Sequence, residues 1–462
     1  MSLPCHGFGG CLGARFLAVH STHRDAITRV VIGYLTALVI GTGLLMTPAA
    51  TVAPGGISLL SGLFTATSAL SVTGLAVLDT GGDFTFFGQA VILVLIQIGG
   101  LGVLLFTALL AIVVAGKAGL RLRQSVATET RSSTIGGIGP MVRRIVALAV
   151  GAELVVAVAL FLRLRLSYDE PLGAAIWNAV FHAVSAFNNA GFGLRSNNLM
   201  DFVADPFICG PISCAVILGG LGYPVVIELA RRYRSPLTWS LTTRAVVVMT
   251  PVLLVGGTIY IAMIEWNNPN TMGTLDAWGK IQASAFQSTI TRTAGFNSVD
   301  ISQMHPATWL GLDILMFIGG GPAGTAGGVK ITTVLVLGAM TWTEFTGGRA
   351  VNLLGRRVSR SVHRQATTVI VLALTLIVAA TMIIMLDAPS LGLDRILFEV
   401  ISGFGTVGLS TGITTDLPGL SQVVIIITMA LGRLGPVTIA SVLALRVRPQ
   451  RFELPKERPL IG

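Results

Sequence analysis

Long apolar stretches alternate with short polar segments along the chain. Several uninterrupted apolar runs reach the length of about 20 residues that a helix needs to cross a bilayer. Examples are residues 29–46, 89–115, 366–386 and 420–445. The composition agrees, because 53% of the 462 residues are hydrophobic and only 11% are charged, which is too few to cover that apolar surface in water. The pattern predicts an all-α polytopic membrane protein embedded in a lipid bilayer.

Most Lys and Arg residues fall into five polar segments: the N-terminus, the stretch after residue 115, residues 231–244, residues 349–364 and the C-terminal tail. Most acids lie in the remaining polar loops. Basic segments next to membrane spans stay in the cytoplasm, so all five segments and both termini are predicted to be cytoplasmic. The net charge of +10 therefore reflects membrane orientation, and no nucleic-acid partner is expected.

One order of elements recurs four times between the basic segments: an apolar span, a shorter segment, a Gly motif and a second apolar span. The predicted division is a tail (1–25), repeat one (26–116), a linker (117–140), repeat two (141–230), a linker (231–240), repeat three (241–344), a linker (345–365), repeat four (366–446) and a tail (447–462). Because all five basic segments share one side, each repeat crosses the membrane an even number of times. The short segments, of about 14 residues, are below spanning length and are predicted to enter and leave from outside. This predicts eight transmembrane helices and four re-entrant pore helices, arranged with pseudo-symmetry around one pore.

The Gly motifs read "SVTGLAV", "NNAGFGL", "RTAGFNS" and "GTVGLST". Non-helical backbone is tolerated at membrane depth only where protein buries it or where it lines a water-filled cavity. Four such strands around an axis would present rings of carbonyl oxygens, which can replace the hydration shell of a cation. The alternative, four tight re-entrant turns, does not explain matched positions. The predicted selectivity filter comprises Val72, Thr73, Gly74, Asn189, Ala190, Gly191, Thr293, Ala294, Gly295, Thr406, Val407 and Gly408.

Six residues before each filter glycine stands a hydroxyl residue, which we interpret as bonding back to its own helix. The residues in question are Ser68, Ser185, Thr289 and Ser402.

The second spans share the motifs "QIGGLGV", "ILGGLGY", "FIGGGPA" and "ALGRLGP", whose glycines would let helices approach closely. Repeat three continues as "GGGPAGTAGG", residues 319–328, which should break a helix, and repeat four carries Arg433 in place of a glycine. An intramembrane charge costs about 2.5 to 3.5 kcal/mol on insertion scales, so these features predict a constriction below the filter. The alternatives are pairing of Arg433 with carbonyls or an acid, and snorkelling of Lys330 to the inner surface. The predicted gate comprises Gly319, Gly320, Gly321, Gly324, Thr325, Gly327, Gly328, Lys330 and Arg433.

Two further charges lie near the predicted filter. Arg292 stands three residues before Gly295, and Glu399 stands nine before Gly408. A cation beside a cation site should point away from it, so the two are expected to pair and support the loops. His182, at a corresponding place in repeat two, is expected to be a packed, hydrogen-bonded side chain.

The polar residues do not indicate an enzyme. Four cysteines in a chain of this length do not suggest a disulfide framework. Cys5, Cys11, His20 and His23 could form a metal site, but a flexible tail is the preferred interpretation. A secondary transporter with alternating access would need inverted repeats or proton-loading carboxylates, whereas the charge distribution makes these repeats parallel.

The motifs "SVTGL", "NNAGF", "TRTAGF", "GTVGLSTG", "GGGPAGTAGGVKITT" and "LGRLGP" together resemble the Trk/Ktr/HKT superfamily of cation transporters, over essentially residues 26–446. The first span starts near residue 28, with no room for the additional N-terminal helix pair of the Trk branch. The closer likeness is therefore to the membrane subunit of bacterial Ktr-type potassium uptake systems.

The resemblance implies a homodimer in the inner membrane of a bacterial cell, gated by a cytoplasmic ring of RCK-type nucleotide-binding subunits. It implies K⁺ as the transported ion, held by the filter carbonyls, with a requirement for Na⁺ left open and no organic cofactor. Members with Gly in all four filter strands favour K⁺, and Gly74 is intact here. The alternative is a less selective K⁺/Na⁺ transporter of the Trk/HKT type or a cation symporter. Gly321-Pro322-Ala323 departs from relatives that often have Ser nearby.

Overall fold

The structure is a computed structural model that describes residues 31–117 and 138–445, with side chains described over residues 31–102 and 142–434. Cys5, Cys11, His20 and His23, the predicted tails and most of the first linker lie outside these residues.

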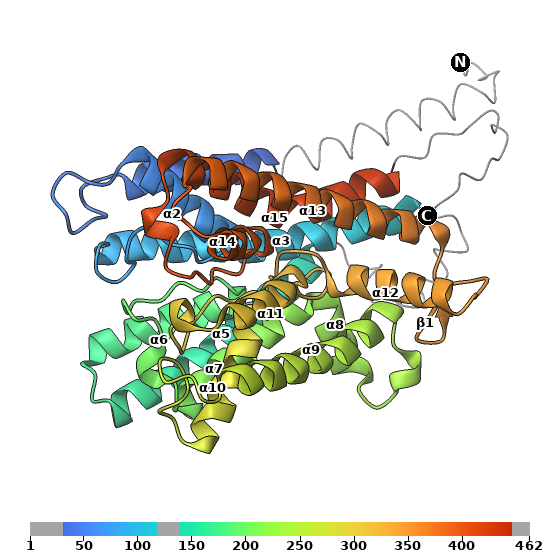
Figure 1. The fold of residues 1–462 in the computed structure, drawn as a ribbon, viewed down its shortest axis with the longest axis horizontal. Coiled ribbons are helices and arrows are strands. Elements are labelled where there is room, and N and C mark those ends of the chain that lie inside the picture. The colour runs from blue at the N-terminus through green and yellow to red at the C-terminus, as the bar shows by residue number, and fades with distance from the viewer. Residues whose placement is uncertain (1–30, 118–137, 446–462) are drawn as a thin grey trace, which may run out of the picture.

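The described chain is mostly helical (Figure 1). The α-helices are Val31–Leu45, α2 (Leu59–Ser71), α3 (Phe86–Lys117), α5 (Ile138–Ser167), α6 (Leu172–Asn188), α7 (Pro206–Leu221), α8 (Tyr223–Arg232), α9 (Leu241–Glu265), α10 (Ala277–Thr291), α11 (Pro306–Phe317), α12 (Ile331–Phe345), α13 (Arg360–Asp387), α14 (Leu393–Gly405) and α15 (Gly419–Leu445). Short 3₁₀ turns occupy Met200–Phe202, Pro236–Thr238, Ile301–Gln303 and Thr414–Asp416, and strands β1 (Asn352–Leu353) and β2 (Arg356–Arg357) form an antiparallel hairpin.

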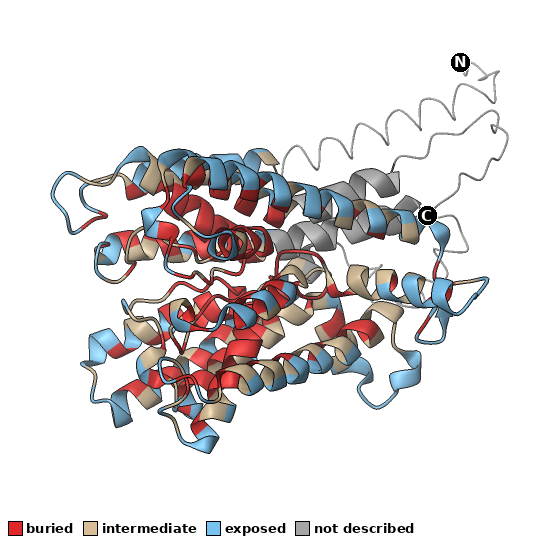
Figure 2. Cartoon of the chain, in the orientation of Figure 1, coloured by how far each residue is buried: buried red, intermediate tan, exposed pale blue. Residues whose placement is uncertain are grey.

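The four short segments predicted to be re-entrant are helices α2, α6, α10 and α14. Each one is largely buried toward its C-terminal end, where the Gly motif follows. Figure 2 shows buried residues gathered around these helices, whereas the outer faces of the long helices are exposed. On α9 the exposed residues include Val248, Val252 and Ile259. An apolar outer face of this kind suits contact with lipid, as the sequence predicts.

Among the described residues, three helices are long and apolar enough by themselves to cross a membrane: Val142–Ser167, Leu241–Glu265 and Arg360–Asp387. The remaining predicted spans are broken or are only partly described. In the described part of the chain, apolar helices of 10–17 residues include Val31–Leu45 and Phe86–Gly102. The predicted class of an α-helical polytopic membrane protein is confirmed.

The second span of repeat two is bent, which the sequence pattern did not predict. Helices α7 and α8 meet at 99°. Gly222 lies at the bend with φ of 92°, and Pro224 follows it within the first turn of α8. A Cβ on Gly222 would lie 2.3 Å from the carbonyl oxygen of Pro322. The bend therefore makes room for the glycine-rich loop of repeat three.

The second span of repeat three is broken as predicted. Helix α11 ends at Phe317, α12 begins at Ile331, and the intervening residues are held by an isolated parallel bridge between Ile318 and Val329. We call residues 318–330 the central loop. Its position beside α11, α8 and α14 can be followed in Figure 1.

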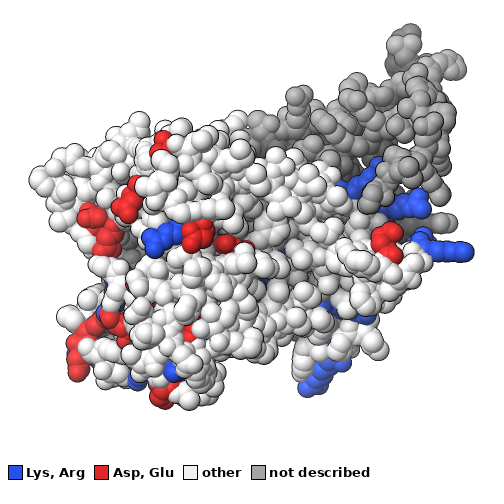
Figure 3. All heavy atoms as spheres, in the orientation of Figure 1, with Lys and Arg blue, Asp and Glu red and all other residues white. Residues whose placement is uncertain are grey.

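Charges of opposite sign gather at opposite ends of the molecule. On the face drawn in Figure 3, most acids lie at the end where the pore helices begin, and many Lys and Arg residues lie at the end that carries α12 and the β-hairpin. This distribution agrees with the orientation that the basic segments predict.

Candidate functional site

The four motif glycines form a closed ring in the structure. All four have left-handed φ angles, of 94° at Gly74, 71° at Gly191, 65° at Gly295 and 90° at Gly408. A Cβ on each glycine would collide with a carbonyl oxygen of the next repeat: with Ala190 at 2.4 Å, Ala294 at 2.6 Å, Val407 at 2.2 Å and Thr73 at 2.0 Å, in the same order. The contacts thus run from repeat one to two, three, four and back to one. Only glycine fits such a ring without displacement.

Three of the four strands leave their pore helix through a left-handed residue that is not glycine. These residues are Val72 (φ 57°), Asn189 (φ 61°) and Thr406 (φ 49°). This conformation is an outlier for β-branched Val and Thr, and such strain persists only where the surroundings impose it. The third strand differs, because α10 ends with Arg292 in the ordinary right-handed region at φ of −75°.

Hydrogen bonds fix each strand on its helix. The amide that follows each left-handed residue donates to a pore-helix carbonyl: Thr73 to Ser68 at 2.8 Å, Ala190 to Ser185 at 2.7 Å and Val407 to Ser402 at 2.9 Å. In the third strand, the Ala294 amide donates to Ile290 at 2.8 Å instead. These bonds consume the amides, so the strand carbonyls are the groups left to face a ligand.

The serine hydroxyls have a role that the sequence reading missed. Gly74 N–H donates to Ser68 Oγ at 3.0 Å, and Gly408 N–H donates to Ser402 Oγ at 3.1 Å. Ser185 Oγ instead donates to the Phe192 carbonyl at 2.8 Å. Of the four aligned hydroxyls, only that of Thr289 bonds back to its own helix, at Ala285. The constant spacing of six residues before each glycine was the available signal.

The glycines of the second spans pack against the pore helices in three repeats. A Cβ on Gly99, Gly219 or Gly432 would lie 2.0 Å from a carbonyl oxygen in the last turn of the neighbouring pore helix, which belongs to Leu70, Phe187 and Phe404 respectively. The equivalent Gly319 instead lies against the Gly327 carbonyl, within the central loop. Close packing explains these glycines, and repeat three departs where its helix is broken.

The central loop lies directly against the fourth filter strand and against α7. A Cβ on Gly327 would lie 2.1 Å from Thr406 Oγ1, and one on Gly328 (φ 64°) would lie 3.3 Å from the Gly405 Cα. Toward α7, Gly321 N–H donates to the Gly220 carbonyl at 2.8 Å and Thr325 N–H donates to Gly219 at 3.1 Å. Gly320 and Gly324 also pack against the Gly220 carbonyl. The central loop is therefore held between repeats two and four by hydrogen bonds on one side and close packing on the other.

Arg433 connects the central loop to repeat one. The residue is 3% exposed, and its guanidinium donates to the Thr325 carbonyl and, at 3.2 Å, to the Gly99 carbonyl. Thr325 Oγ1 also donates to the Phe187 carbonyl at 3.3 Å. Arg433 thus pairs with carbonyls, as one interpretation of the sequence expected, and one of them belongs to the predicted gate.

Lys330 ends the central loop and is half-buried. Its Nζ donates to the Ala326 carbonyl, which lies within the same loop. The ammonium therefore helps to hold the loop closed on itself, in place of the alternative in which it extends to the membrane surface.

The expected pair of Arg292 and Glu399 is not formed. Glu399 is 1% exposed and accepts a hydrogen bond from Thr414 Oγ1, outside the filter. Arg292 instead lines a small cavity with Thr250 of α9 and Gly320 of the central loop. The right-handed end of α10 turns Arg292 toward repeat two, so the prediction was wrong about the partner although both residues are buried.

Behind the second filter strand, a carboxylate is held by amides. Glu153 of α5 accepts hydrogen bonds from Gln97 Nε2 at 3.1 Å and from Asn188 Nδ2 at 3.1 Å. Asn188 ends α6 immediately before the strand. This contact joins repeats one and two next to the ring.

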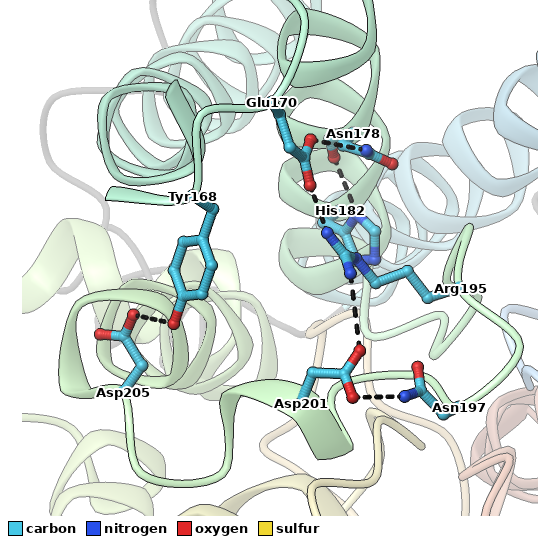
Figure 4. A network of polar contacts seen from close by, with 8 residues as sticks. All are labelled: Tyr168, Glu170, Asn178, His182, Arg195, Asn197, Asp201 and Asp205. Atoms are coloured by element: carbon cyan, nitrogen blue, oxygen red, sulfur yellow. Dashed lines mark hydrogen bonds and ion pairs between the residues drawn. The ribbon is translucent and has the colours of Figure 1, made fainter. Parts of the chain in front are cut away.

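A polar network braces the loop that follows the second filter strand (Figure 4). Glu170 accepts a hydrogen bond from Asn178 at 3.0 Å and pairs with Arg195, which also lies 3.6 Å from Asp201. His182 is packed as expected, with Nδ1 2.8 Å from the Asn178 carbonyl. The network links the segment after α5 to the loop that follows the second strand of the ring.

Asp205 caps α7 within the same region. Burial alone would raise the pKa of its carboxyl, but hydrogen bonds from Arg163 at 2.8 Å, Phe207 N–H at 2.9 Å and Tyr168 at 2.9 Å outweigh it and hold the pKa below the ordinary value of 3.8. Asp205 is therefore ionised in the folded protein at neutral pH.

The fold is that of a helical membrane protein, and backbone carbonyls arranged in a ring are a means by which such proteins coordinate cations. The family model described as TrkH, cation transport protein, matches residues 19–453. The chain belongs to this family.

Individual relatives cover nearly the whole chain. It is 38% identical over 409 residues to the Ktr system potassium uptake protein B of Bacillus subtilis (strain 168). That alignment covers 88% of this chain and 90% of the relative. It is 32% identical to the potassium/sodium uptake protein NtpJ of Enterococcus hirae, in an alignment that covers 93% of this chain and 96% of the relative. The crystal structure of the potassium transporter TrkH from Vibrio parahaemolyticus matches with a TM-score of 0.71 at 17% identity, over 92% of this chain and 85% of that one. This likeness confirms the fold.

Proposed function

We propose that this protein is the membrane subunit of a potassium uptake system. Potassium enters through the ring of Gly74, Gly191, Gly295 and Gly408, where the carbonyls of the filter strands replace its hydration shell. The observation that carries the proposal is the closed cycle of contacts, in which each glycine lies against a carbonyl of the next repeat. The relative named as potassium uptake protein B supports the choice of ion.

The direction of movement follows from the membrane potential. An inside-negative potential of 100 mV contributes about 2.3 kcal/mol per charge, which favours entry of K⁺ without a coupled reaction. The site therefore needs only to select and release the ion, as rings of carbonyl oxygens do.

The central loop is the proposed gate. It contacts the filter strand at Thr406 and is held by hydrogen bonds to α7 and by Arg433. Opening the path requires these contacts to rearrange. The resemblance to Ktr-type uptake systems implies a homodimer on a cytoplasmic RCK-type ring, and we propose this arrangement here, with the basic cytoplasmic end facing the ring.

Uptake of ⁸⁶Rb⁺ into K⁺-loaded liposomes containing the purified protein tests the function. Competition by external K⁺ and not by Na⁺ is expected. Equal competition would favour the second candidate, a less selective K⁺/Na⁺ transporter, which the name of the Enterococcus hirae relative supports. Uptake that is absent both alone and with the cytoplasmic partner added would contradict the proposal.

A further inference from the structure

Arg292 is a buried cation without a partner. Its side chain lies at the end of α10 and is 8% exposed. Within the described residues it makes no hydrogen bond or ion pair, and its Nε is enclosed without an acceptor. Leaving a charge buried and unpaired costs several kcal/mol. Such a group needs a compensating ligand.

Arg292 borders a cavity between repeats two and three. About 20 Å³ is open to the centre of a water-sized sphere, which is enough for roughly one small occupant. The cavity is lined by α7, α9, the end of α10 and the central loop. Its lining residues are Val216, Ile217, Gly220, Leu221, Thr250, Leu254, Thr289, Arg292, Thr293 and Gly320.

The free polar groups of the cavity side chains can donate hydrogen bonds: the guanidinium only donates, and a hydroxyl can donate or accept. The hydroxyl of Thr250 is buried, 6% exposed for the residue, and has no partner. The Thr289 hydroxyl is engaged with Ala285 and that of Thr293 with Asn189. No carboxylate lines the cavity. The other lining residues are mostly apolar side chains and glycines. The small volume suits a monatomic ion, and two groups that can donate hydrogen bonds, one of them charged, suit an anion.

We propose that this cavity binds a halide ion, chloride in the cell, held by Arg292 and Thr250. The bound ion compensates the charge of Arg292. That charge lies three residues from Gly295, and an uncompensated cation there would repel K⁺ through the low-dielectric protein. Binding stands on the cavity alone, whereas the effect on K⁺ rests on the proposed function.

The binding test is the melting temperature of the purified full-length protein at increasing chloride, with gluconate replacing it at constant ionic strength. A ligand that binds only the folded state raises the melting temperature as its concentration passes the dissociation constant. We expect this rise in the wild type. Lys280→Gln, a control that removes a cation on the same helix away from the cavity, should retain it, and Arg292→Gln should lose it.

Two results would overturn the site: a wild-type melting temperature that does not depend on chloride, or the same dependence in Arg292→Gln. If Arg292→Gln does not fold, the chloride dependence of the melting temperature of Thr250→Val tests the site instead. It keeps the charge and removes one donor, so the chloride midpoint must move to higher concentration. An unchanged midpoint in Thr250→Val would then contradict the assignment.

The transport test separates the ion site from the proposed function. With chloride on both sides of the liposome, the KM for ⁸⁶Rb⁺ should be several-fold lower than with gluconate, and Lys280→Gln should behave alike. An equal KM in both anions would overturn the electrostatic effect. Absence of uptake in both anions would count against the proposed function, while a chloride-dependent melting temperature would still establish the site.

Discussion

At the scale of single residues, two of the motif glycines are each held by a serine hydroxyl. Ser68 and Ser402 accept the amide hydrogens of Gly74 and Gly408. Leaving a buried amide without its acceptor costs about 1 to 3 kcal/mol. That amount is comparable with the differences in free energy that decide ion selectivity.

The variant Ser402→Ala should therefore relax the fourth strand and weaken the preference for K⁺ by about tenfold, because 1.4 kcal/mol corresponds to a factor of ten. Selectivity would be measured as Na⁺ competition against ⁸⁶Rb⁺ uptake. Ser284→Ala is the matched control, since Ser284 is a buried pore-helix serine whose hydroxyl donates to Lys280 of its own helix. Equal selectivity in both variants would show that the Ser402 hydroxyl does not contribute to the preference for K⁺.

Asp205 gives a prediction for pH. Its pKa is lower in the folded protein than its ordinary value of 3.8, so its ionisation stabilises the fold above that value. This stabilisation is lost as the pH falls below 3.8 and through the native pKa. The difference in melting temperature between wild type and Asp205→Asn should thus be largest near neutral pH and shrink below pH 3.8. A difference that does not change with pH would show that the carboxylate charge is not involved.

At the scale of elements, Arg433 is the cross-link between α15, the central loop and α3. It bridges the carbonyls of Thr325 and Gly99, which belong to repeats three and one. The two carbonyls accept hydrogen bonds from the guanidinium and so compensate part of the cost of burying its charge. In the proposed conduction path, the same charge would repel K⁺.

The variant Arg433→Gln should free the central loop and remove that repulsion, so uptake of ⁸⁶Rb⁺ without the cytoplasmic partner should increase several-fold. Arg395→Gln serves as the control, because Arg395 is exposed at the start of α14 over the ring of Trp309. Uptake at or below the wild-type rate in well-folded Arg433→Gln would contradict a closing role for the arginine.

The bend between α7 and α8 gives a separate prediction of stability. Gly222→Ala places a Cβ against the Pro322 carbonyl at a φ of 92° and should lower the free energy of unfolding by about 1 to 3 kcal/mol. Gly210→Ala, in α7, meets nothing within 4 Å and should be neutral or stabilising by up to about 1 kcal/mol. Thermal unfolding of both variants in detergent would test this. Equal melting temperatures would show that the bend tolerates a Cβ at residue 222.

At the scale of the whole molecule, the long apolar runs, the period of the Gly motifs and the clustering of basic residues were enough to predict the helical class. They also predicted the four short buried helices and the break after Phe317. These features follow from the spacing of residues and from the length of each apolar segment relative to the bilayer. Both can be read directly from a single sequence. The sequence could also indicate that four glycines are equivalent, because their neighbours are equivalent.

The contacts between repeats could not be predicted in the same way. The pairing of Arg292 with Glu399 failed because α10 ends in a right-handed residue, whereas the other three pore helices end in left-handed ones. The bend at Gly222 was missed because the central loop of another repeat creates it. Side-chain direction and contacts at long separation depend on the assembled fold and not on local spacing.

The central claim is that the ring of four glycines selects the transported ion. Its most direct test compares Gly74→Ala with Gly403→Ala, by K⁺ and Na⁺ competition against ⁸⁶Rb⁺ uptake. A Cβ on Gly74 collides with the Ala190 carbonyl at 2.4 Å, whereas one on Gly403, a buried glycine of α14, has ordinary contacts of 3.7 to 3.9 Å.

We expect Gly403→Ala to keep wild-type uptake and exclusion of Na⁺, and Gly74→Ala to lose uptake or to admit Na⁺ as readily as K⁺. Wild-type uptake and selectivity in Gly74→Ala would show that ions are selected elsewhere and would contradict the account.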